Sequence, residues 1–266
     1  MPVIAANSII DPRARLADDV EVGPHCVIAG DVTLAAGTRL LHSVHLQGPL
    51  TIGRDNVFYP FCCVGFPPQD RKFDPGTPGS GTRIGDRNVF RESVTIHRAT
   101  GAHPTTIGDD NYFMVNSHAG HDAVVGNRCT LANGALLAGH VRLFDDVTLG
   151  GGSALHQFCR MGRLSMMSGV VAVAQDVPPF CIAYNMRSVG SLNIVGLRRA
   201  GYRRHIKPLQ RAFDILYRES HANAEAADAI TTELGDDPLC VELAEFIRTT
   251  KRGLCPYGGG AANVES

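Results

Sequence analysis

Histidine is the residue type in this chain whose placement most suggests chemistry. Six of the eleven histidines lie between residues 97 and 156, and five of them, His97, His118, His121, His140 and His156, are the candidates for chemistry. Asp122 directly follows His121, so that an imidazole and a carboxylate are neighbours. An imidazole titrates near neutral pH, which suits it to general-base catalysis or, in its neutral form, to binding a metal ion.

The elements that would position these histidines follow a six-residue period. Apolar residues occupy every sixth position in three runs, from Ile4 to Val64, from Ile84 to Ile96 and from Ile107 to Val173. A helix repeats near 3.6 residues and an ordinary strand every two, so neither explains this period. The period is typical of a hexapeptide solenoid, a parallel β-helix in which each unit makes one short strand and one corner.

The same period predicts the architecture. Three hexapeptides close one triangular coil, the apolar residues point inward, and successive coils stack at roughly 4.8 Å. The 26 apolar positions predict between eight and nine coils. Gly, Asn and Asp gather at the expected corners, as in residues 52–56 and 107–111, where they tolerate a left-handed backbone. We therefore expect a mainly β fold, a left-handed parallel β-helix over residues 1–190.

Other segments depart from the six-residue period. A Pro/Gly-rich excursion loop over residues 65–82 interrupts it, and a five-residue bulge over 100–104 interrupts it again. Helical spacing predicts a C-terminal α-helical domain over residues 191–255. Its helices begin near Pro208, at Asn223 as a cap and after Pro238, and the last ends at Gly253. The Gly-rich residues 256–266 are predicted to be a disordered tail.

Composition excludes several classes of function. A net charge of −1 gives no electrostatic basis for binding nucleic acid or an anionic membrane surface. No segment has the pattern of a secretion signal or of a transmembrane span. The eight cysteines include no CxxC pair and are interpreted as reduced apolar residues of a cytoplasmic protein.

Assigning the hexads in rotation to three faces places the histidines in one region. Ile96, Ala119, Leu137, Leu155 and Val173 fall in one column. The five histidines all lie within three residues of a member of that column, so they line the same corner region in successive coils. A line of titratable groups is an unusual way to build a corner, which favours function over stacking alone.

Two functions of such a column compete. A metal site occurs in the γ-class carbonic anhydrases, which resemble this chain in their hexapeptide solenoid. Those enzymes use a His-x4-His pair, whereas His118 and His121 are only three apart, although histidines on adjacent coils could still bind a metal ion. The other function is acyl transfer, in which a histidine removes the proton of a sugar hydroxyl as it attacks a thioester.

The motifs favour acyl transfer. The chain resembles the UDP-N-acetylglucosamine acyltransferases of lipid A synthesis over nearly its whole length. The motifs that carry the resemblance are QDRK (69–72), IHR (96–98), NSHAGHD (116–122), GNRC (126–129), LAN (131–133), LAGHV (137–141), HQF (156–158), AQDVPP (174–179), NI (193–194) and GLRR (196–199). Hexapeptide repeats are shared by many acyltransferases, but this ordered series of histidine motifs is specific.

The resemblance implies a role for each matched residue. His121 would be the general base, Asp122 would orient it, and the Gly139 backbone N–H would donate a hydrogen bond to the oxyanion. Positions that hold the sugar nucleotide in the family match Asp70, Lys72, His118, His140, Gln157, Asn193 and Arg199. The acyl groove would include His156 and Gly169, with Gly169 helping to set chain length.

The resemblance also implies substrates and partners. The donor would be a 3-hydroxyacyl chain on acyl carrier protein, the acceptor would be the 3-hydroxyl of UDP-N-acetylglucosamine, and the reaction would be the first step of lipid A biosynthesis. The family is a homotrimer with active sites between subunits. No cofactor or metal is expected, since the thioester is already activated.

Two departures from the family pattern leave alternatives open. The family usually has Glu where this chain has Val195, and a second basic residue where it has Ala200. Both positions belong to the nucleotide side of the cleft, so a 3-amino analogue of the sugar is an alternative acceptor. The later N-acyltransferase of lipid A synthesis, a coenzyme A-dependent acetyltransferase and a non-catalytic scaffold are further alternatives.

Overall fold

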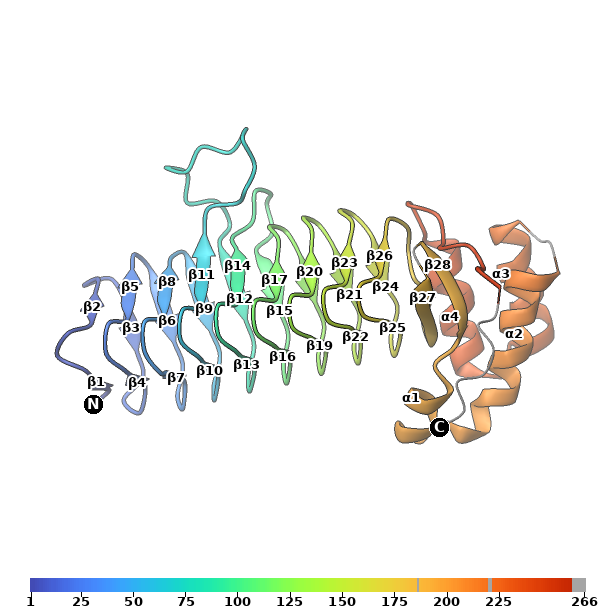
Figure 1. The fold of residues 1–266 in the computed structure, drawn as a ribbon, viewed down its shortest axis with the longest axis horizontal. Coiled ribbons are helices and arrows are strands. Elements are labelled where there is room, and N and C mark those ends of the chain that lie inside the picture. The colour runs from blue at the N-terminus through green and yellow to red at the C-terminus, as the bar shows by residue number, and fades with distance from the viewer. Residues whose placement is uncertain (186, 220–221, 260–266) are drawn as a thin grey trace.

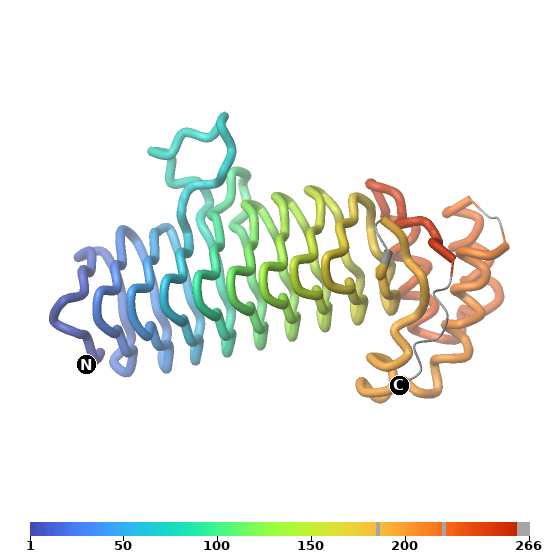
Figure 2. The backbone as a smooth tube through the Cα atoms, in the orientation of Figure 1, coloured from blue at the N-terminus to red at the C-terminus, as the bar shows by residue number. Residues whose placement is uncertain are grey.

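The computed structural model describes residues 1–185, 187–219 and 222–259. Short strands wind into a long parallel β-solenoid, and a group of helices covers its C-terminal end (Figure 1). The backbone trace shows the coils stacked along one axis, with a single large loop leaving the side of the stack (Figure 2).

Strands β1 to β26 form the coils and β27 and β28 extend one face. The first sheet contains β1 (Val3–Ile4), β4 (Glu21–Val22), β7 (Arg39–Leu40), β10 (Val57–Phe58), β13 (Val89–Phe90), β16 (Tyr112–Phe113), β19 (Thr130–Leu131), β22 (Thr148–Leu149), β25 (Met166–Met167), β27 (Cys181–Asn185) and β28 (Ser188–Leu192). The second contains β2 (Ile9–Ile10), β5 (Val27–Ala29), β8 (His45–Gln47), β11 (Cys63–Phe66), β14 (Thr95–His97), β17 (His118–Ala119), β20 (Leu136–Leu137), β23 (Ala154–Leu155) and β26 (Ala172–Val173). The third contains β3 (Arg15–Leu16), β6 (Val32–Leu34), β9 (Leu50–Ile52), β12 (Thr82–Ile84), β15 (Thr105–Ile107), β18 (Val124–Val125), β21 (Arg142–Leu143) and β24 (Arg160–Met161).

Every apolar residue of the six-residue period lies on a strand and faces the interior, which confirms the predicted β-helix. From Val22 onward these residues are at most 2% exposed. Ile4 is 43% exposed because the first coil has no coil beneath it. The period therefore defines the core, and the coils pair in register across both interruptions, with Ile52 opposite Ile84 and Ile84 opposite Ile107.

The corners repeat one backbone feature. The third residue after an inward residue commonly has a positive φ, as at Asp55, Asp110 and Asn116. Arg, Phe, Leu and Val occupy equivalent corners as well, so the geometry of the coil imposes this conformation on residues that rarely adopt it alone. A corner residue thus has a fixed direction whatever its type.

Stacks of like residues fill the interior. Phe90 lies between Phe58 and Phe113, with ring centroids 4.6 and 5.2 Å away. Asn56, Asn88 and Asn111 form a buried ladder in which each side-chain carbonyl accepts from the backbone N–H of the next coil. All eight cysteines are unpaired.

The C-terminal end differs in detail from the expectation. Strand β27 pairs with β25, and β28 returns antiparallel to it, a hairpin that the six-residue period does not predict. The helices that follow are α1 (Ile194–Arg199), the 3-10 helix η1 (Arg203–His205), α2 (Ile206–Arg218), α3 (Asn223–Leu234) and α4 (Pro238–Arg248). Ion pairing of Arg163 with Glu242 joins the last coil to α4.

Two predicted helix ends are wrong by a few residues. Ala222, not Asn223, is the N-cap of α3, and the side chain of Glu225 accepts from its N–H. Helix α4 ends at Arg248 with Thr249 as its cap, not at Gly253. In the predicted tail, Tyr257 pairs with Val189 and residues 260–266 lie outside the described part of the chain. None of the described helices is long and apolar enough to cross a membrane.

The aromatic stack gives a test of the core. Replacing Phe90 by Ala should lower the free energy of unfolding by about 3–5 kcal/mol, because a cavity would open between two rings that cannot close it. Phe61 is 59% exposed on a corner, so Phe61→Ala should change it by less than about 1 kcal/mol. Denaturant unfolding of both variants measures the difference, and equal losses would contradict this packing.

Candidate active site

The predicted histidine column is present. In the second sheet Ile96 pairs with Ala119, Ala119 with Leu137, and Leu137 with Leu155, so the coils keep the phase that the sequence predicts. The histidines project from strands β14 and β17 and from the corners that follow β17, β20 and β23. The in-register stacking of the coils therefore brings residues into one region that lie up to 59 positions apart in the chain.

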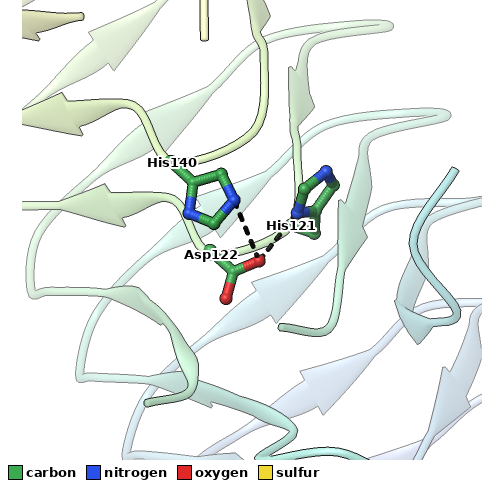
Figure 3. A group of neighbouring side chains, drawn as sticks. All are labelled: His121, Asp122 and His140. Atoms are coloured by element: carbon green, nitrogen blue, oxygen red, sulfur yellow. Dashed lines mark hydrogen bonds and ion pairs between the residues drawn. The ribbon is translucent and has the colours of Figure 1, made fainter. Parts of the chain in front are cut away.

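His121 and Asp122 form a hydrogen-bonded pair at the corner after β17. His121 Nδ1 lies 2.7 Å from Asp122 Oδ2 (Figure 3). Asp122 occupies the left-handed corner position with φ 59°, which turns its side chain back toward its neighbour in sequence. Because the carboxylate accepts at Nδ1, the imidazole keeps its lone pair on Nε2, the atom that could accept a proton.

The five-residue bulge holds the carboxylate of Asp122. Thr100 donates to Oδ2 from its hydroxyl at 2.6 Å and from its backbone N–H at 3.0 Å, and the Gly101 N–H donates to Oδ1 at 2.9 Å. Burial disfavours the charge, but the bonds from Thr100, His121 and Gly101 outweigh it and lower the pKa of Asp122 to about 2. The bulge thus keeps the partner of His121 ionised.

Gly139 and His140 lie one coil above the pair. A Cβ on Gly139 would stand 2.6 Å from His121 Nε2, so only glycine leaves this nitrogen free. Within the described chain no group accepts from the Gly139 N–H. The His140 ring lies edge-on to that of His121, with centroids 5.1 Å apart, and stacks on Phe158 at 4.6 Å. An unengaged donor therefore stands beside the candidate base.

His118 lies on β17, the strand that precedes the pair, and His97 lies one coil below on β14, with ring centroids 4.9 Å apart. Thr95 Oγ1 lies 2.8 Å from His118 Nδ1. Burial, together with the imidazoles of His118 and His121, lowers the pKa of His97 to about 4, and burial lowers the pKa of His118 as well. Both rings are consequently neutral at neutral pH.

A groove of about 710 Å³ runs along the outer face of the second sheet beside this corner. Its floor is made of small and apolar residues, chiefly Leu136, Ala138, Ala154 and Ala172. The residues His118, His156, Gln69 and Arg187 also line it. His121 and Asp122 do not line the groove, but Gly139, which lies against His121 Nε2, directly follows the lining residue Ala138.

The remaining predicted site residues are not gathered in this groove. Asp70 and Lys72 are exposed on the excursion loop, where the Lys72 N–H donates to Asp70, and Gln157 and Arg199 are exposed elsewhere. Gly169 lies at the corner before β26, against Gly151. Asn193 caps α1 by accepting from the Gly196 N–H, and its amide donates to Leu164.

Several residues of the site were not identified from the sequence. Thr100 belongs to no motif, and it lies in a bulge where the six-residue period assigns no register. Thr95 could have been found from the period, as it directly precedes the inward Ile96 and must face outward. Phe158 belongs to the HQF motif but was given no role, and Arg187 belongs to none of the motifs.

The competing metal site has support from distance alone. Ligand atoms of His121, Asp122 and His140 all lie within 4.8 Å of one another. However, the Asp122 Oδ2 that faces both rings already interacts with two donors of Thr100 and with His121. A metal ion would have to replace these bonds, so the donor set suits a hydrogen-bonded pair better than a metal centre.

Comparison with known proteins agrees with this site. Residues 176–255 match the family model described as UDP N-acetylglucosamine O-acyltransferase, domain 2, and residues 1–36 and 104–139 match the hexapeptide transferase repeat. An acyl-[acyl-carrier-protein]–UDP-N-acetylglucosamine O-acyltransferase of Thermodesulfovibrio yellowstonii is 42% identical over 96% of this chain and 100% of its own length. The enzyme of the same name from Herminiimonas arsenicoxydans is 40% identical over 96% of this chain and 99% of its own length.

Solved structures agree as well. The UDP-N-acetylglucosamine acyltransferase of Francisella novicida superposes with a TM-score of 0.92 at 30% identity, covering 99% of this chain and all of that one. The Moraxella catarrhalis enzyme gives a TM-score of 0.90 at 35% identity, covering 95% and 99%. Full-length identity, fold and the ordered histidine motifs together place this chain in the UDP-N-acetylglucosamine O-acyltransferase family.

Proposed function

We propose that the protein transfers a 3-hydroxyacyl chain from acyl carrier protein to the 3-hydroxyl of UDP-N-acetylglucosamine, the first step of lipid A biosynthesis. The observation that carries the chemistry is the His121–Asp122 pair beside the open Gly139 N–H. The apolar groove next to it provides a surface for the acyl chain. The names of the relatives supply the two substrates.

In the proposed mechanism His121 Nε2 removes the proton from the sugar 3-hydroxyl. The oxygen attacks the thioester carbonyl, and the Gly139 N–H stabilises the oxyanion that forms. Asp122 stays ionised and holds the Nδ1 proton of the imidazolium. When the intermediate collapses, the C–S bond breaks and the thiolate takes the proton from His121, which restores the enzyme.

The rest of the proposal concerns assembly and location. A homotrimer would cover exposed apolar side chains such as Leu136, Phe158 and Val170, and would add residues of a neighbouring subunit to the groove. Asn193 and Arg199 would then contact the sugar nucleotide from across that interface. The unpaired cysteines suit a reducing compartment, so we propose that the enzyme works in the cytoplasm.

The transfer reaction can be measured by mass spectrometry with UDP-N-acetylglucosamine and 3-hydroxyacyl carrier proteins of several lengths. Wild type should form an O-acylated sugar nucleotide, and His121→Ala should be slower by about 10²–10⁴-fold because the general base is lost. His42→Ala, on an exposed corner away from the site, is the matched control. A His121→Ala variant as fast as wild type would refute the mechanism, while product only from the 3-amino sugar would point to Val195 and Ala200.

Removal of metal ions separates the proposed mechanism from a metal enzyme. After dialysis against EDTA the rate should stay within about twofold of the untreated enzyme, because no step uses a Lewis acid. Metal analysis of the purified protein accompanies the assay. A loss of rate that Zn²⁺ restores would support a metal at His121, Asp122 and His140 instead.

His97 should make stability depend on pH. The unfolded imidazole has a pKa of about 6.5, whereas the folded one has a pKa of about 4. As the pH falls from 6.5 to 4, the unfolded state binds a proton that the folded state does not, so the free energy of unfolding decreases. His97→Gln should remove up to about 3 kcal/mol of this decrease, while His42→Gln should not. Urea unfolding at several pH values tests this, and equal slopes for wild type and His97→Gln would contradict it.

A further inference from the structure

Arg98 is the most deeply buried arginine among the described residues, and the mechanism does not use it. It follows β14 directly, and only 2% of its surface is exposed. In the described part of the chain no carboxylate forms an ion pair with it, and its Nε has no hydrogen-bond partner. A buried cation without a counterion is unfavourable, so a compensating role is expected.

The guanidinium is bound by backbone carbonyls of the excursion loop. Its Nη2 donates to Pro75 and to Thr77 at 2.9 Å each, and its Nη1 donates to Gly65 at 3.3 Å. The ring of Phe73 lies 5.8 Å below the guanidinium carbon. One side chain therefore contacts the beginning of the loop at Gly65 and its middle at Phe73, Pro75 and Thr77.

The loop has few other attachments. It contains no strand or helix between β11 and β12, and its turns at Asp70 and Asp74 are closed by bonds within the loop. At its end, Gly81 accepts from the Ala99 N–H and Ser80 donates to Gly101. Both of these bonds go to the segment that Arg98 begins.

The same segment also binds the carboxylate of the His121–Asp122 pair. Thr100 and Gly101, two and three residues after Arg98, donate to Asp122. Meanwhile the loop places Gln69 at the groove, next to the exposed Asp70 and Lys72. Residues 98–101 thus connect the loop that reaches the groove with the carboxylate that orients His121, and the two interruptions of the six-residue period form one unit.

We propose that Arg98 is a positioning residue that fixes the excursion loop over the groove for binding of the sugar nucleotide. This rests on the proposed function for the identity of the acceptor, but the anchoring of the loop does not. Arg98 touches neither the reacting atoms nor the groove. Its loss acts through the position of Gln69, Asp70 and Lys72.

Two measurements test the proposal. Arg98→Met should increase the rate of tryptic cleavage at Arg71 and Lys72 by about ten- to hundredfold, because the freed loop fits a protease better. In the transfer assay it should raise KM for UDP-N-acetylglucosamine by about tenfold, with kcat and KM for the acyl donor within about twofold. Arg98→Lys keeps the charge but not the forked geometry, so its cleavage rate and its KM should lie between those of Arg98→Met and wild type.

Arg83→Met is the matched control, since Arg83 is exposed on β12 beside the same loop, and it should resemble wild type. Circular dichroism and the melting temperature identify a variant that fails to fold, in which case Arg98→Lys alone decides. Unchanged cleavage would overturn the anchoring. Faster cleavage with unchanged KM would overturn the positioning role. Wild-type protein without transferase activity would count against the proposed function, while the cleavage rates would still decide the anchoring.

Discussion

The stacking of one inward apolar residue on the next, coil after coil, is the constraint on which the site depends. It places the third residue after an inward position in a left-handed corner in most coils, even where that residue is Phe, Leu or Val. Asp122 and His140 occupy this position in successive coils, with φ of 59° and 60°. Their side chains are therefore aimed by the packing of Ala119 and Leu137 inside the prism, and a rigid scaffold of this kind suits a site that must hold its donors in place.

The bulge over residues 100–104 determines the charge state of Asp122 at the corner after β17. A carboxylate that is largely buried beside two imidazoles would ordinarily be costly, but three hydrogen bonds from Thr100 and Gly101 compensate it without a nearby cation. An arginine in that place would have stabilised Asp122 equally well while drawing it away from His121. Neutral donors keep the carboxylate available to the imidazole, and burial keeps His97 and His118 uncharged next to the base.

Much of this could be predicted from sequence because the period is local and repeated. The phase of the apolar residues survived both insertions, so the column that carries the histidines was found without any structure. The partners of Asp122 could not be found, because the path of residues 98–104 depends on contacts with the excursion loop rather than on the period. The hairpin of β27 and β28 was missed for a similar reason, because β27 is fixed by its pairing with β25. The start of α3 and the end of α4 depend on local bonds instead: the Glu225 side chain accepts from the Ala222 N–H, and the Thr249 N–H donates to Glu245.

The central claim is that the geometry of the corner makes His121 a base through an ionised Asp122. A single-turnover measurement of acyl transfer with Asp122→Asn, combined with calorimetric binding of UDP-N-acetylglucosamine, tests it most directly. The account predicts that the chemical step slows by about 10²–10⁴-fold while the sugar nucleotide binds with nearly wild-type affinity. An unchanged chemical step, or a loss confined to binding, would contradict it.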